Sequence, residues 1–305
     1  MTVSAYTTAD LLADIKQEGM IPTSQSTYEN SSILNLATRQ LRSKVVPYLS
    51  AVREGYMIWP GTIDLTSGTT KYNIPSRSVV MSLDDVLVLD TSGDERSIPY
   101  IDPSSRDKYN SRNTGAFRSN LAFYLEWNKI VLTQDPGSQY TSLSTPYMIR
   151  PGKLVETTDA GKITSFDSGT GVVTLDNVPS DFTTSLSYDI VGGSGGFEYV
   201  ALDLAASAVD TSTITLASIP TDLEVGDWVC VAGETAVPQI PEDLAPILVY
   251  ETLVKILKSL GDWDGARAAM EELKELKESL LKVLEPRIKG ESKFVLSGSR
   301  GGLYN

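Results

Sequence analysis

Two ten-residue stretches of this chain are near copies of each other, and they decide how its centre is interpreted. The first is Val173-Thr-Leu-Asp-Asn-Val-Pro-Ser-Asp-Phe182, and the second, Ile214-Thr-Leu-Ala-Ser-Ile-Pro-Thr-Asp-Leu223, follows at an offset of 41 residues. The alignment continues through the strand-like residues 188–191 and 229–232. Each copy is typical of a strand, a Pro-Ser/Thr-Asp turn and a second strand. Because two copies are too few for a solenoid, the repeat predicts a small β-barrel or sandwich built from two similar β units.

Upstream of the repeat, short runs of alternating apolar side chains predict further strands. These runs are residues 72–74, 85–89, 97–101, 123–126 and 129–132. The dipeptide Trp127-Asn128 joins the last two runs and predicts a tight hairpin in which the asparagine takes the positive φ. The polar residues 104–120 predict an exposed loop.

The N-terminal segment carries helical periodicity instead. Residues 8–18 predict a first helix, which Thr7 or Thr8 can cap. Residues from about 30 to 52 predict a longer helix, because apolar side chains recur there every three or four positions. Pro47 should kink this helix, since proline lacks the backbone donor and its ring clashes with the preceding turn.

The C-terminal segment from Pro241 to Glu285 predicts two amphipathic helices that meet at Gly261. The short connection favours an antiparallel pair, and its apolar face requires a partner. We expect the N-terminal helices to supply that partner. The predicted fold class is therefore α+β: a helical bundle formed by the N- and C-terminal helices, with a large β-rich insertion that resembles a barrel or a sandwich.

This organisation predicts five segments along the chain. They are residues 1–56 (the N-terminal part of the helical bundle), 57–160 (a β-rich insertion), 161–237 (the β-rich two-copy repeat), 238–285 (a helical hairpin that completes the bundle) and 286–305 (an extended C-terminal docking tail).

The composition excludes several kinds of catalysis. The 305 residues include no histidine, which removes Ser-His-Asp and Cys-His nucleophilic catalysis and His-ligated zinc. The single cysteine, Cys230, cannot form an intrachain disulfide, and its apolar surroundings in the sequence predict that it is buried. We predict no catalytic residue, no cofactor and no metal, and hence no enzyme.

Several short motifs resemble functional sites but lack an essential part. Asp262-Trp-Asp-Gly265 begins like a calcium loop, yet position twelve is Leu273, so helix capping is the better interpretation. Gly192-Gly-Ser-Gly-Gly196 lacks the Gly-Lys-Ser/Thr that a phosphate-binding loop requires, which favours a flexible turn. The tryptophans are expected in the core or in interfaces, with sugar stacking as the alternative. They are Trp59, Trp127, Trp228 and Trp263.

Charge and hydropathy constrain the partners. The net charge of −13 opposes sequence-independent binding of nucleic acid, which depends on Lys and Arg, but it suits a wall past which DNA slides. No apolar run is long enough to span a bilayer, and the N-terminus does not resemble a signal peptide. We therefore expect synthesis in the cytoplasm and no membrane partner.

The residues after Pro286 form a basic, glycine-punctuated segment, the C-terminal tail. Four cations against Glu291 give residues 286–305 a net charge of +3, whereas the whole chain carries −13. Spaced apolar side chains distinguish this tail from a simple solubility tail, and they predict that it docks into a partner. The predicted partner-binding residues are Arg287, Lys289, Lys293, Phe294, Val295, Leu296, Arg300, Leu303 and Tyr304.

Several segments together resemble the head-to-tail adaptor (connector) proteins of tailed bacteriophages. These segments are Val46-Pro-Tyr-Leu49, Arg53-Glu-Gly-Tyr56, Lys71-Tyr-Asn-Ile-Pro-Ser-Arg77, residues 123–136, Tyr147-Met-Ile-Arg-Pro-Gly-Lys-Leu-Val155, Ile240-Pro-Glu-Asp-Leu244 and Pro286-Arg287. They span most of the chain, although each motif is short. The β-rich insertion is larger than the smallest, all-helical members of that family carry.

The resemblance implies a structural protein of the virion at the head-tail interface, made in the host bacterial cytoplasm. It implies a homo-oligomeric ring of about twelve copies below the portal protein, whose helices line or surround the channel that DNA passes without specific binding. The C-terminal tails would bind the portal, and the opposite side would receive tail, nozzle or fibre proteins.

Two other functions remain open from the residues alone. The first is a β-rich module of a phage tail that binds carbohydrate or fibres through an exposed tryptophan. The second is a glycan hydrolase that uses a pair of carboxylates, although 39 acidic residues provide no single pair that stands out.

Overall fold

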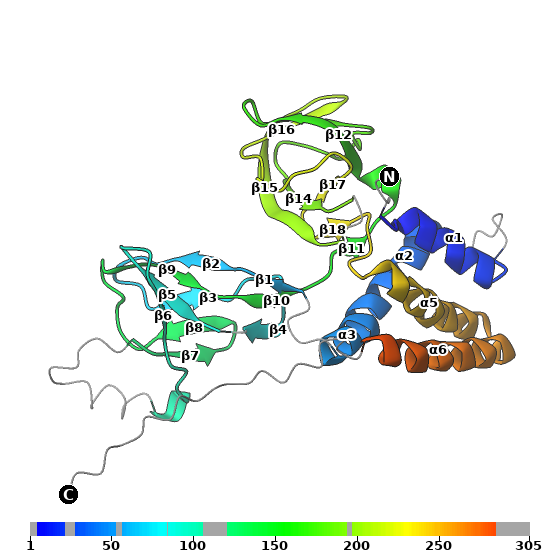
Figure 1. Cartoon of the computed structure of the whole chain (residues 1–305), viewed down its shortest axis with the longest axis horizontal. Coiled ribbons are helices and arrows are strands. Elements are labelled where there is room, and N and C mark those ends of the chain that lie inside the picture. The colour runs from blue at the N-terminus through cyan, green and yellow to red at the C-terminus, as the bar shows by residue number, and fades with distance from the viewer. Residues whose placement is uncertain are drawn as a thin grey trace, which may run out of the picture.

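The computed structural model describes residues 5–21, 28–52, 57–83, 85–105, 121–193 and 197–284. Figure 1 shows three parts: a barrel at the top, a group of small sheets on the left and helices on the right. We call residues 161–231 the barrel and residues 58–149 the β unit. Two short parallel strands, β11 (Lys153–Leu154) and β18 (Glu234–Thr235), lie between the barrel and the helices.

The barrel is a closed sheet of six strands in the order β12-β13-β16-β15-β14-β17. The strands are β12 (Gly161–Asp167), β13 (Val172–Leu175), β14 (Ser187–Val191), β15 (Tyr199–Val209), β16 (Thr213–Leu216) and β17 (Trp228–Val231). Alternate side chains point inward along each strand and form one apolar core that includes Ile163, Tyr188 and Ile214. The structure thus forms the barrel, not the sandwich.

The two copies of the sequence repeat are related by a two-fold axis inside this barrel. β13 pairs with β16, and Val173 lies directly opposite its repeat mate Ile214. β14 pairs with β17, and Asp189 lies directly opposite its mate Cys230. Because each pair consists of equivalent residues, the two-fold axis passes between the two residues of each pair. The sheet closes because strands of one repeat copy pair with strands of the other.

Hydrogen bonds outside the ladders obey the same symmetry. The Leu175 N–H donates to the Ser212 carbonyl at 3.0 Å, and its equivalent, the Leu216 N–H, donates to the Gly171 carbonyl at 2.9 Å. The predicted turns match too, since the residue three positions after each repeat proline donates back to the proline carbonyl.

The β unit consists of three small antiparallel sheets. Its strands are β1 (Ile58–Trp59), β2 (Thr62–Asp64), β3 (Lys71–Asn73), β4 (Ser78–Leu83), β5 (Leu87–Asp90), β6 (Glu95–Ser97), β7 (Phe123–Glu126), β8 (Lys129–Leu132), β9 (Tyr140–Ser144) and β10 (Tyr147–Ile149). The sheets β2-β9-β5-β6 and β3-β8-β7 share one core, whereas strands of the sheet β1-β10-β4 pack against the barrel through Tyr147 and Ile149.

The helices are α1 (Thr8–Glu18), α2 (Asn30–Gln40), α3 (Val46–Val52), α5 (Ala245–Leu260) and α6 (Trp263–Leu284). Thr7 caps α1 in a capping box with Asp10, which fits the predicted start. A π-helical turn, η1 (Leu41–Val45), connects α2 to α3, and the Val46 N–H donates to the Leu41 carbonyl. This wider turn comes just before Pro47, where a regular helix would lose a hydrogen bond.

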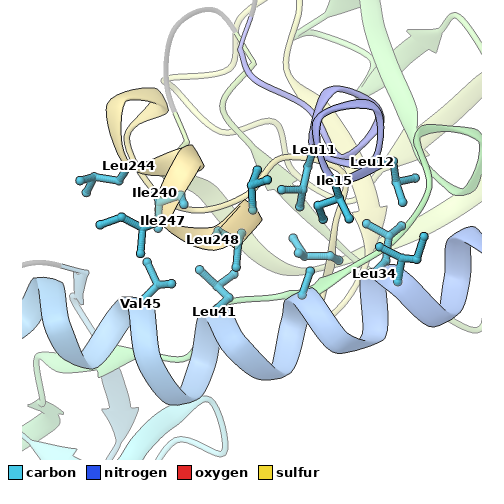
Figure 2. Close-up of a cluster of buried hydrophobic side chains, with 14 of the residues drawn as sticks. Leu11, Leu12, Ile15, Leu34, Leu41, Val45, Ile240, Leu244, Ile247 and Leu248 are labelled. Atoms are coloured by element: carbon cyan, nitrogen blue, oxygen red, sulfur yellow. The ribbon is translucent and has the colours of Figure 1, made fainter. Parts of the chain in front are cut away.

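One apolar cluster joins these helices, as Figure 2 shows. Leu11, Leu12 and Ile15 from α1 lie toward Leu34 of α2, and Leu248 from α5 lies toward Leu41 of η1. The cluster is not purely helical. Its members include Leu154 on the short strand β11 and Ile240 in the segment before α5.

The predicted fold class, a helical bundle with a β-rich insertion, is therefore wrong. The β-rich parts, which include a closed barrel, extend over most of the described chain, and the described helices lie beside them without closing a bundle. The physical reason is that strands also cover the helices: α2 contacts β11, and the Thr38 hydroxyl accepts a hydrogen bond from the Leu154 N–H at 3.0 Å. Among the described helices, none has the length and apolar character needed to cross a bilayer.

Two leucines of α5 provide a test of this arrangement. Leu248→Ala, at a fully buried position, should lower the free energy of unfolding by about 2–5 kcal/mol, because it removes transfer energy and leaves a cavity. Leu260→Ala, at a position 45% exposed, should change it by about 0.5 kcal/mol or less. Urea denaturation measures both, and equal losses would contradict the packing described.

Candidate assembly surfaces

None of the nine predicted partner-binding residues can be placed. Arg287, Lys289, Lys293, Phe294, Val295, Leu296, Arg300, Leu303 and Tyr304 all lie outside the described residues, which end at residue 284. The surfaces below are therefore built from other parts of the chain, and the docking role of the C-terminal tail stays a prediction.

The hairpin between β7 and β8 presents a tryptophan at its tip. Trp127 is 90% exposed and has a φ of 56°, so the indole projects from a left-handed backbone. The prediction that Asn128 takes the positive φ is wrong. A bulky residue in this conformation costs roughly 1–2 kcal/mol, which a glycine would avoid.

Charged side chains flank this tip. The Lys71 ammonium lies 2.8 Å from the Glu126 carboxylate across β3 and β7, and Lys129 is exposed on the other side of the turn. An indole between charged groups has the composition of an interface anchor, with an apolar centre and a polar rim. We call Trp127 and Lys129 the hairpin tip.

A second exposed apolar group lies at one end of the helices. The end of α1 rests on α5, because the Tyr250 hydroxyl donates to the Glu18 carboxylate at 2.9 Å. Beyond this contact α5 ends at Gly261, and Figure 1 shows the end of α1 and the α5–α6 connection on the same side. The exposed apolar side chains here are Met20 (90% exposed), Trp263 (65%), Leu260 (45%) and Met270 (40%).

Backbone strain and exposure coincide at two of these positions. The described non-glycine residues with a positive φ are Met20, Met57, Trp127 and Asp203. Met20 and Trp127 are also the most exposed of the large apolar side chains in the described part of the chain. The positive φ ends α1 at Met20, whose N–H donates to the Gln17 carbonyl, and turns the hairpin at Trp127, but a glycine would do the same with less strain. The exposed side chains therefore make both positions candidates for contact with another molecule.

The negative charge is concentrated in and around the barrel. Residues 156–234 contain 13 Asp and Glu against one Lys, which gives −12 of the −13 carried by the whole chain. Since exposed carboxylates include those of Asp167, Asp181 and Asp222, the barrel presents a strongly negative surface.

A buried ion pair joins the β unit to this barrel. The Asp189 carboxylate is fully buried, and Arg77 donates to it from Nη1 at 2.5 Å. Arg77 also donates from Nη2 to Asp203 at 2.7 Å. The backbone N–H groups of Asp203 and Gly233 donate to the Asp189 carboxylate at 3.0 and 2.8 Å. Together with Arg77, they hold this carboxylate in one position.

The environment of Arg77 stabilises its charge. Burial opposes that charge, but the hydrogen bond and the charge of Asp189, followed by the charge of Asp203, raise the pKa of Arg77 above its usual value. The repeat mate of Asp189 is Cys230, which offers no carboxylate. The barrel can therefore receive this arginine on one side of its two-fold axis and not at the equivalent place on the other.

Two cavities lined by described residues are candidates for the catalytic site of a glycan hydrolase. A cavity of about 70 Å³ beside α2 is lined by Glu156 and Asp159, and burial, followed by the charges of Glu156, Asp181 and Glu234, raises the pKa of Asp159. This volume is too small for a sugar ring, since ligand pockets hold roughly 300–1,000 Å³. A cavity of about 290 Å³ in the β unit is lined by Val88, Arg96, Ser97, Ile98, Pro99, Leu121 and Tyr140, without a carboxylate.

The remaining sequence predictions divide between confirmed and corrected. Asp262 caps α6, since its carboxylate accepts from the Gly265 N–H at 2.9 Å. Cys230 is fully buried as expected. Trp228 packs in a core, but Trp127 does not, and Trp263 is 65% exposed. The exposure of these two indoles had no clear sign in the sequence beyond the turn residues beside them.

Comparison with known proteins adds no assignment. No protein-family model matches the sequence, and no curated protein matches it. The residues and their geometry therefore carry the argument for function.

Replacing Arg77 tests the joint between the β unit and the barrel. Arg77→Ala should lower the free energy of unfolding by roughly 3–5 kcal/mol, because it leaves the buried Asp189 carboxylate without its counter-charge. The matched control is Lys71→Ala, which removes an exposed ion pair of the same unit and should cost about 1 kcal/mol or less. Thermal or urea denaturation compares them, and a mild effect of Arg77→Ala would contradict the proposed joint.

Cysteine reactivity tests the closure of the barrel. Burial raises the pKa of the Cys230 thiol to about 12, so it stays protonated and shielded at pH 8. We expect no reaction with a thiol reagent such as dithionitrobenzoate in the native protein, and one thiol per chain in urea. Rapid labelling of the native protein would show that the barrel opens at β17.

Proposed function

We propose that this protein is a head-to-tail adaptor of a tailed bacteriophage, a structural component of the virion that forms a ring below the portal protein. The ring extends the channel for DNA and provides the attachment site for tail components. The observation that carries the proposal is the coincidence of strain and exposure at Met20 and Trp127, which places apolar anchors outward on a chain with a well-packed interior.

The sequence resemblance gives this proposal its specific form. The matching motifs include Lys71-Tyr-Asn-Ile-Pro-Ser-Arg77, which ends in the arginine that joins the β unit to the barrel. Assembly proteins need subunits that hold one shape while they present several contact surfaces. The buried Arg77–Asp189 pair supports such rigidity, because it ties two β-rich parts at one geometry.

The distribution of charge supports a role around DNA. The acidic barrel repels phosphate groups, so a ring of these subunits would let DNA pass without binding it. The C-terminal tail, with its net charge of +3, is the segment that binds the portal in this proposal. Weak docking of each tail becomes strong when many tails bind together, because the ring raises their effective concentration.

Deleting the C-terminal tail tests the portal contact. The chain of residues 1–305 should assemble with the portal protein of the same phage, and removal of residues 287–305 should weaken that binding by at least tenfold while the monomer stays folded. Mass photometry measures the assemblies, and circular dichroism checks the fold. Portal binding of the shortened chain at full strength would refute the docking role.

One observation favours a second candidate, a carbohydrate- or fibre-binding module. Trp127 offers an exposed indole next to the Lys71–Glu126 pair, and exposed aromatic rings stack on sugars. Titration with cell-wall saccharides should then shift the indole fluorescence of the native chain but not of Trp127→Phe at equal concentration. The adaptor proposal expects no shift in either protein.

A further inference from the structure

One of the places where the two repeat copies of the barrel differ is an exposed turn. The first copy has Asp181-Phe-Thr-Thr184 there, and the second has Asp222-Leu-Glu-Val225. Both turns have the same construction, because Phe182 and Leu223 are equally buried, at 5% exposure. The second copy therefore carries a carboxylate and a valine where the first carries two threonines.

The valine does not serve the fold of the barrel. Val225 is 56% exposed, and its mate Thr184 is exposed as well, so neither position belongs to the core. Asp222 and Glu224 are exposed on the same turn. This turn thus presents an apolar side chain beside two carboxylates, on the most acidic part of the chain.

The hairpin tip of the β unit has the opposite character. Trp127 supplies a large apolar surface on a strained backbone, and Lys129 supplies an exposed cation. Apolar groups would meet apolar groups, and a cation would meet carboxylates, if the hairpin tip contacted the turn of residues 222–225. Tryptophan is also the residue type that most often dominates the energy of an interface.

We propose that the hairpin tip of one copy docks on the turn of residues 222–225 in the barrel of the neighbouring copy. The inference rests on the proposed ring and names the surfaces through which its subunits meet. Because the contact joins two different surfaces, a pair of copies in contact still has one hairpin tip and one turn of residues 222–225 that are not yet bound. Such contacts close into a ring when the rotation between neighbours permits it.

Charge favours a second copy of this chain as the occupant. Residues 156–234 carry a net charge of −12, so the remaining residues of the chain together carry −1. Identical subunits then repel less when the barrel of one meets another part of the next than when two barrels meet. The chain already makes one contact of this kind internally, since Arg77 of the β unit binds Asp189 of the barrel.

Cysteine cross-linking between two singly substituted chains tests this contact. One chain carries Asn128→Cys, which keeps Trp127 in place, and the other carries Val225→Cys, a small apolar replacement. The matched control is Thr184→Cys, at the equivalent position across the barrel axis. Because the native Cys230 is fully buried, a disulfide between the two chains reports the engineered positions.

The chains are mixed, assembled alone or on the portal, and oxidised mildly. Gel electrophoresis without reductant should show at least fivefold more cross-linked dimer for residues 128 and 225 than for residues 128 and 184. Equal or absent cross-linking in assembled rings would overturn the inference and leave the proposed function standing. If neither chain assembles with or without the portal, both proposals fail.

Charge reversal gives an independent readout in the full-length chain. Lys129→Glu should weaken self-association by about tenfold, and Glu224→Lys in the same chain should restore at least part of the loss. Sedimentation velocity measures both, and Lys71→Ala, on the adjacent strand β3, serves as the control. If Trp127→Ala or Lys129→Glu weakens portal binding while self-association is unchanged, the tip binds a different partner and the inference is wrong.

Discussion

The arrangement of the β-rich parts depends on a carboxylate that has no access to water. Asp189 lies beside the two-fold axis of the barrel, opposite its mate Cys230, and its oxygens accept from Arg77 and from two backbone N–H groups. A buried charge of this kind is tolerated only when its partners stay in place. The β unit must therefore sit where Arg77 reaches Asp189, and the symmetry-related side of the barrel, which has Cys230, offers no second position.

Departures from internal symmetry mark the places where this chain is specialised. The core positions of the two repeat copies are alike, as the equal burial of Phe182 and Leu223 shows. Two of the differences between the copies are at Asp189, which joins the β unit, and at Val225, which is exposed. A closed barrel needs the same core from both copies, whereas its outer surface is free to differ. The two copies thus contribute equivalent residues to the core of the barrel, whereas their outer surfaces make different contacts.

Exposed strain gives a second guide to function. A glycine would end α1 at position 20 or turn the hairpin at position 127 with less backbone strain, and the isolated chain gains nothing from leaving the Met20 and Trp127 side chains in water. The same residues gain stability once a partner covers them, because apolar surface then leaves water. A chain whose interior is well packed and whose anchors are strained is suited to assembly, and the proposed adaptor ring uses both properties.

Local rules in the sequence determined the elements, and long-range contacts decided their arrangement. The repeat around Val173 and Ile214, the cap at Asp262 and the burial of Cys230 could all be predicted, because period, turn chemistry and polarity act over a few residues. The failure of the described helices to close a bundle could not, since the apolar faces of α1 and α5 match any apolar surface, and Leu154 of a strand shares their cluster. The exposure of Trp127 could not be predicted either, because side-chain exposure depends on what the rest of the chain leaves uncovered.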